Sequence, residues 1–264
     1  MDAAIDLTDR SKALDLSNIR AQLIRLEDTI TFHLIERAQF PHNKTIYVPG
    51  GVPIPGSDLS LMDYLLQEQE RIQSRVRRYE SPDEHPFFPQ ALETPILEPL
   101  QYPQILWAND VNENETIKKR YIEEIIPAVC PTNRVDRGAS QENYGSSASA
   151  DVNLLQALSR RIHFGKFVAE SKFQQETDKF VQLIKAGDRQ GIDEAITNMK
   201  VEQLVLKRIE TKAQTYGSDP VLEEYRNKID SEAVVNMYKN IIIPITKVVE
   251  VEYLMQRLKG TQWE

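Results

Sequence analysis

The sequence predicts an all-α protein, a single domain built from several long helices. Apolar residues recur at three- and four-residue steps over most of the chain, as on the buried face of an amphipathic helix. Strand-like alternation with hairpin signals is absent, and so is a repeat of fixed period. The chain has 264 residues, 41% hydrophobic and 27% charged, which is enough for a sizeable core and typical of a globular protein.

Two long helices are predicted in the N-terminal part. The first covers about 15–40, where apolar residues follow a helical period and Asp15 or Ser17 can cap the start. Prolines and glycines between 48 and 56 then enforce a loop. The second helix is expected from 57 to 80, and the prolines that follow it break the pattern.

The middle of the chain is predicted to be less regular. Residues 90–116 contain several prolines, which favours short helical pieces and turns. A helix is expected over 115–129, as far as Pro127. Residues 131–150 are rich in Ser, Asn and Gly without periodicity, which predicts an exposed loop.

The C-terminal half again shows helical periodicity. Pro244 is expected to kink the last helix or to mark its restart. The helices predicted here cover about 151–174, 176–186, 188–196, 198–216 and 230–258.

Composition narrows the possible partners and compartments. A net charge of −8 argues against a nucleic-acid backbone or an anionic membrane as the main partner. Cys130 is the only cysteine, so an internal disulfide cannot form. The N-terminus lacks the pattern of a signal peptide, and apolar runs are too short to span a bilayer. We expect a cytoplasmic protein.

A cationic strip stands out within the predicted helix 151–174. At about 100° per residue, Arg161 and Lys172 would point within roughly 20° of each other, with Gly165 and Val168 between them. Such a strip over small residues can receive a compact anion. The same pair can equally form ion pairs with glutamates of a neighbouring helix, and periodicity alone leaves both interpretations open.

Other helices also place polar residues near apolar faces. Asn198 and Glu202 are one turn apart, and so are Thr246 and Glu250. The segment around Glu250 is so apolar that full exposure of its carboxylate is hard to arrange. Arg20 lies at the border of an apolar stripe, where arginines usually extend into solvent. Solvated ridges remain the alternative for each pair.

The sequence contains no recognisable motif for covalent catalysis or metal binding. Its histidines and Cys130 lack metal-ligand spacing. Residues 49–53 lack the Lys-Ser/Thr of a phosphate-binding loop, and serines lack a nucleophile elbow. An enzyme with this sequence would therefore work by binding and electrostatics, without a cofactor or a metal.

The segment Leu158-Ser-Arg-Arg-Ile-His-Phe-Gly-Lys-Phe-Val-Ala-Glu-Ser-Lys-Phe173 resembles the core signature of the fungal-type, all-helical chorismate mutases. Further blocks resemble the same family in the same order, from about residue 14 to 258: Asn18–Arg20, Arg25–Asp28, Arg75–Glu84, Tyr102–Leu106, Ile243–Lys247 and Val249–Tyr253.

The resemblance implies a helical homodimer that converts chorismate to prephenate in phenylalanine and tyrosine biosynthesis. It implies a single domain over 1–264, with catalytic helices at about 15–40, 151–174, 198–216 and 230–258. The implied substrate contacts are Arg20 and Arg161 for carboxylates, Lys172 and Glu250 for the ether oxygen, and Asn198, Glu202 and Thr246 around the hydroxyl and second carboxylate.

The resemblance also implies an effector site at the dimer interface, which binds tyrosine as inhibitor and tryptophan as activator. Its regulatory segments are about 57–84 and 131–150. Asp230 departs from the family's usual threonine, so the balance of activity states can differ. The alternative for the arginine pair is a solvated helix end, paired with Glu80 and Asp83. The implied effector residues are Arg77, Arg78, Asn143, Gly145, Ser146 and Ser149.

Two other classes of protein remain open on the residues alone. A non-catalytic helical sensor of amino acids would keep the effector site and lose the activity. A helical scaffold would bury its charges in ion pairs and bind no small molecule.

Overall fold

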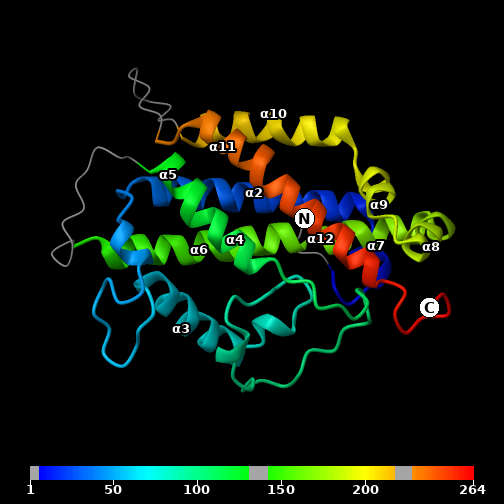
Figure 1. The fold of residues 1–264 in the computed structure, drawn as a ribbon, viewed down its shortest axis with the longest axis horizontal. Coiled ribbons are helices and arrows are strands. Elements are labelled where there is room, and N and C mark those ends of the chain that lie inside the picture. The colour runs from blue at the N-terminus through cyan, green and yellow to red at the C-terminus, as the bar shows by residue number, and fades with distance from the viewer. Residues whose placement is uncertain (1–5, 131–141, 218–227) are drawn as a thin grey trace.

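Two long helices packed side by side form the axis of the molecule (Figure 1). They are α2 (Leu16–Ala38) and α6 (Tyr144–His163). Their directions are antiparallel, since Arg37 at the end of α2 bonds to Asp151 early in α6, whereas Ile19 at the start of α2 shares an apolar cluster with Phe164. The computed structural model describes residues 6–130, 142–217 and 228–264.

The other helices cover this central pair. α3 (Leu61–Arg75) packs on α6, α10 (Met199–Tyr216) packs on α2, and α12 (Ile243–Gln256) packs on α6 and α7 (Figure 1). The remaining α-helices are α1 (Arg10–Ala13), α4 (Asn114–Arg120), α5 (Ile126–Val129), α7 (Gly165–Gln175), α8 (Thr177–Ala186), α9 (Arg189–Ile196) and α11 (Ser231–Met237). Short 3₁₀ helices cover Lys44–Tyr47, Arg78–Glu80 and Pro89–Ala91.

The predicted all-α class is confirmed for the described part of the chain. In residues 6–130, 142–217 and 228–264, extended pairing is limited to an isolated bridge between Ile54 and Ser57. Within the same residues, no helix is both long and apolar enough to cross a membrane.

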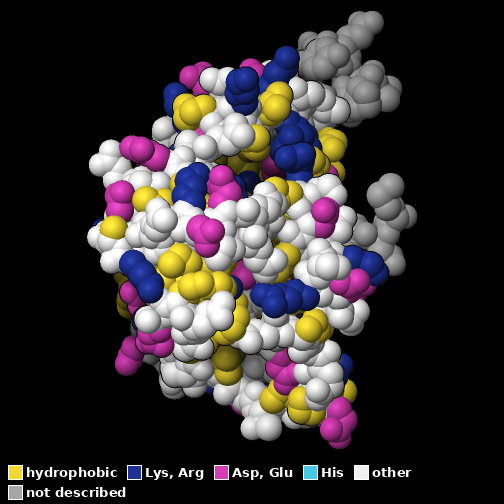
Figure 2. All heavy atoms as spheres, turned by 90° about the vertical axis from the view of Figure 1, so that its right-hand side faces the viewer, with side chains coloured by type: hydrophobic (Ala, Val, Ile, Leu, Met, Phe, Trp, Pro, Cys, Tyr) yellow, Lys and Arg dark blue, Asp and Glu magenta, His cyan; other side chains and the backbone are white. Residues whose placement is uncertain are grey.

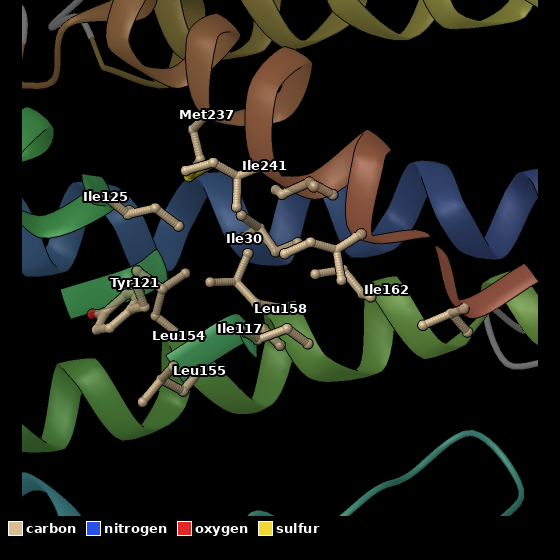
Figure 3. Packing of buried hydrophobic residues seen from close by; sticks show 14 of the residues in the cluster. Ile30, Ile117, Tyr121, Ile125, Leu154, Leu155, Leu158, Ile162, Met237 and Ile241 are labelled. Atoms are coloured by element: carbon tan, nitrogen blue, oxygen red, sulfur yellow. The ribbon is translucent and has the colours of Figure 1, made fainter. Parts of the chain in front are cut away.

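The main core fills the space between α2, α6 and the C-terminal helices. Ile30 of α2 and Leu158 of α6 are fully buried, and Ile241, just before α12, packs into the same cluster (Figure 3). Tyr121 and Ile125 close the cluster on the side of α4 and α5. These residues belong to the amphipathic faces that the helical period predicts, because burying one apolar face per helix is the main source of stability.

Prolines restart two helices in the same way. A π-helical turn, Tyr121–Ile125, precedes Pro127, and another, Tyr238–Ile242, precedes Pro244. A proline ring clashes with the carbonyl four residues earlier and cannot donate to it. The wider π turn relieves both problems, so the expected restart at Pro244 is confirmed.

The predicted loop over 131–150 is wrong in its last part. Residues 131–141 lie outside the described residues, but α6 already begins at Tyr144. Tyr144, Ser147 and Ala148 are buried, and Asp151 on the next turn holds Arg37. Burial and this ion pair stabilise a helix that the Ser- and Gly-rich composition disfavours.

The predicted continuous helix over 151–174 is also wrong. Phe164 interrupts it, so that α6 ends at His163 and α7 begins at Gly165. The ring of Phe164 stacks on that of Phe167, with centroids 4.5 Å apart, in the small cluster at the start of α2. The angle between Arg161 and Lys172 that a single helix would give therefore does not apply.

Candidate active site

The helices α7 and α12 approach each other closely at a glycine. A Cβ built on Gly165 would lie 3.0 Å from Cγ2 of Thr246 and 3.1 Å from Cγ of Glu250. Glycine is needed here because its missing side chain lets α12 pack directly on the backbone of α7. Thr246 and Glu250 are consequently both buried, and the expectation that Glu250 is withdrawn from solvent is confirmed.

Lys172 faces the carboxylate of Glu250 from α7. Its Nζ lies 4.0 Å from Oε2 of Glu250, and it donates a hydrogen bond to the carbonyl oxygen of Ile196 at the end of α9. The separation of 4.0 Å is longer than a direct hydrogen bond. Both groups keep hydrogen-bonding capacity for a third partner.

Glu250 holds its proton to an unusually high pH. Burial raises the pKa of its carboxyl to about 7, against the pull of nearby cations that favour the charged form. These cations are Lys172 on α7, Arg161 on α6 and Lys247 on α12, and the carboxylate of Asp193 on α9 adds to the increase. The group is therefore poised between donor and acceptor near neutral pH.

Arg161 is a buried cation at the C-terminal end of α6. The residue is only 6% exposed, and its Nε has no hydrogen-bond partner among the described residues. A buried guanidinium N–H without a partner costs free energy, and it leaves one donor of Arg161 available to a ligand. Its charge acts on Glu250 and on the buried Tyr238.

The N-terminal end of α10 borders the same region. Asn198 is the exposed N-cap of this helix, and its side chain accepts a hydrogen bond of 3.2 Å from the backbone N–H of Val201. Glu202, one turn later, forms a 2.8 Å ion pair with Lys247 of α12. The ion pair ties α10 to the helix that carries Thr246 and Glu250.

Arg20 lies at the edge of this arrangement. It is exposed on α2, next to Ile19, which packs into the cluster of Phe164 and Phe167. Within the described residues, no hydrogen bond or ion pair joins Arg20 to the other candidates. The structure thus gathers Arg161, Lys172, Thr246 and Glu250, with Glu202 linked through Lys247, and leaves Arg20 and Asn198 exposed at the rim.

The arginines expected to bind an effector follow α3 and are held by the chain itself. Arg77 has a positive φ of 70° and donates a hydrogen bond of 2.5 Å to the carbonyl oxygen of Glu98. Arg78 donates to Gln156 of α6, with 2.8 Å between Nη1 and Oε1, and pairs with Glu84 at 3.1 Å. The partners that a solvated helix end would use, Glu80 and Asp83, are not those of Arg78.

The other expected effector residues lie at the start of α6. Asn143 is its N-cap residue and accepts a hydrogen bond of 2.9 Å from Asn43. Ser149 donates to the carbonyl oxygen of Gly145, so this contact stays within the helix. Gly145 and Ser146 are exposed. These residues precede Gln156 by 7 to 13 positions, about two to three and a half turns, so one chain does not bring them to Arg78.

Sequence reasoning missed partners that complete the arrangement. Lys247 pairs with Glu202 and influences Glu250, yet its only sequence signal is its position beside Thr246. Glu170 of α7 and Arg257 after α12 form a buried pair, and nothing in the periodicity links residues so far apart. Only the packing of α7 on α12 identifies them.

The surface near α8 and α9 is of mixed character. The end of the molecule at the right of Figure 1 carries cationic, acidic and apolar side chains interspersed (Figure 2). Among the described residues, no group of three or more His, Cys, Asp and Glu is placed to hold a metal ion.

The buried cluster can polarise an oxygen atom. Two hydrogen-bond donors 4.0 Å apart can both reach about 2.8 Å from one acceptor, because the three atoms then form a triangle. Protonated Glu250 and Lys172 meet this condition. The neighbouring guanidinium of Arg161 can hold a carboxylate of the same molecule.

Comparisons with known proteins identify the family of the chain. The family model described as chorismate mutase type II matches residues 143–251. The chain is 73% identical to a chorismate mutase of Emericella nidulans over 267 residues, which covers 100% of both chains. The chorismate mutase of Candida albicans in complex with L-tryptophan is 44% identical and superposes with a TM-score of 0.93, covering 98% of this chain and 97% of that one.

A further solved structure, AtCM1 with tyrosine bound in its allosteric site, is 40% identical and has a TM-score of 0.84. It covers 95% of this chain and 99% of its own. Identity of this extent over the whole length, together with the family model, leaves no room for a chance likeness. The chain belongs to the chorismate mutase family and is an isomerase.

Proposed function

We propose that Arg20, Arg161, Lys172, Asn198, Glu202, Thr246 and Glu250 form the site where chorismate rearranges to prephenate. The observation that carries this proposal is the pair formed by Glu250, which is buried, and Lys172, whose side chain is 25% exposed; the two lie 4.0 Å apart and are not engaged with each other by a direct hydrogen bond. Lys172 instead donates to the carbonyl oxygen of Ile196, and the carboxyl of Glu250 keeps its hydrogen-bonding capacity. Their separation fits an acceptor placed between them.

The reaction needs positioning and charge stabilisation. Chorismate is a dianion, and its enolpyruvyl side chain must fold over the ring before the C–O bond breaks and the C–C bond forms. Arg161 and Arg20 would each hold one carboxylate by charge-assisted hydrogen bonds, worth about 1.5–3 kcal/mol each. When the enzyme holds chorismate in this folded conformation, the atoms that react are already close together, and the entropy cost of bringing them together is met on binding.

Negative charge grows on the ether oxygen as its bond to the ring lengthens. Donors at that oxygen bind the transition state more strongly than the substrate, which is the condition for a higher kcat. Lys172 donates as it stands. Glu250 donates only when protonated, and burial keeps it so up to a pH of about 7.

A ligand titration tests this site separately from turnover. An unreactive bicyclic dicarboxylate shaped like the transition state should bind the protein, and Lys172→Ala and Arg161→Ala should each weaken its Kd by at least about tenfold. Lys185→Ala, which removes an exposed lysine on α8, is the matched control and should leave Kd unchanged. Equal Kd values for all these proteins would place the site elsewhere.

We also propose that tyrosine inhibits and tryptophan activates this enzyme. The proposal is supported by two relatives: one solved structure is a complex with L-tryptophan, and another has tyrosine bound in its allosteric site. Arg77 and Arg78 would take the carboxylate or the phenol hydroxyl of the effector. The remaining contacts would come from Asn143, Gly145, Ser146 and Ser149.

A homodimer follows from the same proposal. Arg78 contacts Gln156 of its own chain, about two turns past Ser149, so the two halves of the effector site would come from different protomers. Sedimentation should give a dimer. Rate curves against chorismate should shift in opposite directions with tyrosine and tryptophan, and Arg78→Ala should abolish both shifts. Hyperbolic curves that ignore both amino acids would refute the regulation.

Three further expectations from the sequence concern the alternative protein classes, the residue Asp230 and the cellular location. A non-catalytic sensor or a scaffold does not fit a chain that belongs to a family of isomerases. Asp230 caps α11, accepting a hydrogen bond of 2.9 Å from the N–H of Glu232, so the departure at this position preserves the helix start. Cytoplasmic location stays a prediction of the sequence.

A further inference from the structure

We infer that Glu170, Tyr253 and Arg257 form a clamp that positions α7 on α12, and thereby sets the distance between Lys172 and Glu250. The inference rests on the proposed site and adds positioning residues to it. None of the three clamp residues is assigned a contact with the substrate.

The centre of the clamp is a carboxylate with complete hydrogen bonding. Glu170 of α7 is fully buried and accepts hydrogen bonds from Nε of Arg257 at 2.5 Å, from Nη2 at 3.1 Å and from the hydroxyl of Tyr253 at 2.7 Å. A planar guanidinium that binds both carboxylate oxygens allows little rotation. The contact therefore holds one orientation of α7 relative to the end of α12.

Two aromatic rings lie close to the guanidinium of Arg257. The Cζ of Arg257 lies 4.2 Å from the centre of the Phe173 ring and 4.5 Å from that of Trp107. These cation–π contacts compensate part of the cost of burying the charge. The hydroxyl of Tyr253 also accepts a hydrogen bond of 3.2 Å from the backbone N–H of Trp107.

Two of the three clamp residues lie within one turn of the proposed catalytic groups. Glu170 precedes Lys172 by two residues on α7, and Tyr253 follows Glu250 by three residues on α12. The same helices touch again at Gly165, which packs against Thr246 and Glu250. Two separate contacts thus define both the spacing and the rotation of the helices.

Small rotations matter at this distance. With a helix radius of about 5–6 Å including side chains, turning α7 by about 10° moves a side-chain tip by about 1 Å. A misplacement of about 1 Å can cost on the order of 10²-fold in rate. Opening the clamp would also move the ammonium of Lys172, which among the neighbouring cations acts most strongly on Glu250.

A purely structural role and a positioning role differ in the pH profile. The charged groups facing Glu250 are Lys172 on α7, Arg161 on α6, Lys247 on its own helix and Asp193 on α9. If the clamp fails and Lys172 moves away, the carboxyl of Glu250 loses its main stabilising cation, and its pKa rises further. The alkaline limb of kcat should then shift to higher pH while kcat itself falls.

A matched pair of tyrosines provides the experiment. Tyr253→Phe removes a buried hydroxyl that donates to Glu170, and Tyr121→Phe removes one that donates at 2.6 Å to Asp151, in the network of Arg37. We expect Tyr253→Phe to lower kcat at least threefold, to change KM less, and to shift the alkaline limb upward. Tyr121→Phe should leave kcat and the limb unchanged, even where its melting temperature falls as much.

Glu170→Gln should act in the same direction with a larger effect, at least tenfold in kcat. Because this variant leaves Arg257 buried without its counter-charge, its thermal unfolding is measured alongside, and Tyr253→Phe decides the question if it does not fold.

Lys172→Ala in the same assay distinguishes a failure of the clamp from a failure of the proposed site. If Lys172→Ala loses activity while folded Tyr253→Phe and Glu170→Gln keep kcat and the pH limb, the clamp inference is overturned and the site stands. If Lys172→Ala keeps full activity, the proposed site itself fails.

Discussion

Two buried glutamates at the contact of α7 and α12 have opposite surroundings. Glu170 accepts hydrogen bonds from Arg257 and Tyr253 at 2.5–3.1 Å, so its charge is fully compensated. Glu250, one turn away across the interface, has its nearest cation at 4.0 Å, and burial raises the pKa of its carboxyl to about 7. The hydrogen bonds of Glu170 are made within the protein, whereas the carboxyl of Glu250 remains available to a ligand.

The difference separates what holds the fold from what performs the reaction. A buried carboxylate with charge-assisted partners fixes the relative position of the helices that carry them. Separating the partners is costly, because it leaves an uncompensated charge in the interior. A buried carboxyl without such partners costs stability, and proteins keep such groups mainly where function requires them. Among the arginines, Arg160 pairs with Asp83, whereas Nε of its neighbour Arg161 has no partner among the described residues. Nη1 of Arg257 also lacks one, so an unpaired N–H by itself does not mark a site.

The largest effect is expected from Lys172→Ala. Removing the ammonium that faces Glu250 takes away a donor that acts mainly in the transition state, so kcat at saturating chorismate should fall by about 10²–10³-fold. Lys185→Ala on the exposed face of α8 serves as the control in the same assay. A kcat within twofold of the parent would contradict a catalytic role for the pair Lys172 and Glu250.

Arg161→Ala should rank second. Loss of one charge-assisted contact to a substrate carboxylate should lower kcat/KM by about 10–10²-fold, through KM as well as kcat. The adjacent Arg160→Ala breaks an ion pair of 2.6 Å with Asp83 and should change kcat/KM only a few-fold. Equal losses of kcat/KM in both variants would mean that Arg160 and Arg161 do not differ in function.

Glu250→Gln tests the protonation state directly. Activity should decline as pH rises through about 7, where the carboxyl loses its proton and repels the developing charge. Glutamine donates at every pH, so the variant should keep substantial activity with a flat profile. A variant that retains the alkaline limb of the parent would show that another group titrates.

The same substitution has a stability signature. Because the pKa of Glu250 is raised on folding from 4.5 to about 7, the unfolded chain ionises first as pH rises. The free energy of unfolding should therefore fall between pH 4.5 and 7, by at most about 3 kcal/mol from this group. Denaturant titrations of Glu250→Gln should lack this part of the decline.

Gly165→Ala is expected to have the smallest effect. The new methyl group would lie 3.0–3.2 Å from atoms of Thr246 and 3.1 Å from Cγ of Glu250, so α12 must shift by a few tenths of an ångström. We expect a loss of about 1–3 kcal/mol in the free energy of unfolding and a several-fold decrease in kcat. Unchanged kcat with unchanged stability would show that this contact tolerates movement.

Local sequence patterns were sufficient for most helices and their ends. Asp15 caps α2 as expected, accepting hydrogen bonds from the N–H groups of Ser17 and Asn18 at 2.9 and 3.1 Å. The patterns failed where long-range contacts outweighed composition. Burial of Tyr144 and the ion pair at Asp151 extended α6 into a Ser- and Gly-rich segment, and packing at Phe164 divided a helix that periodicity joined.

The candidate site was found through the family resemblance, and only in part from the residues. Periodicity drew attention to Arg161, Lys172 and Glu250, but it left ion pairing and ligand binding equally open. It gave no signal for Glu170 with Arg257, which are 87 positions apart. Spacing along the chain carries no information on contacts between helices that distant.

The sequence by itself determined the helical class, the approximate helix ends and the burial of Glu250, because these follow from local hydrophobic period, caps and prolines. Only the tertiary structure decided which buried carboxylate is compensated and which retains its proton. That outcome depends on the dielectric surroundings and on distances of a few ångströms between α6, α7, α9 and α12, which are set by packing of the whole chain.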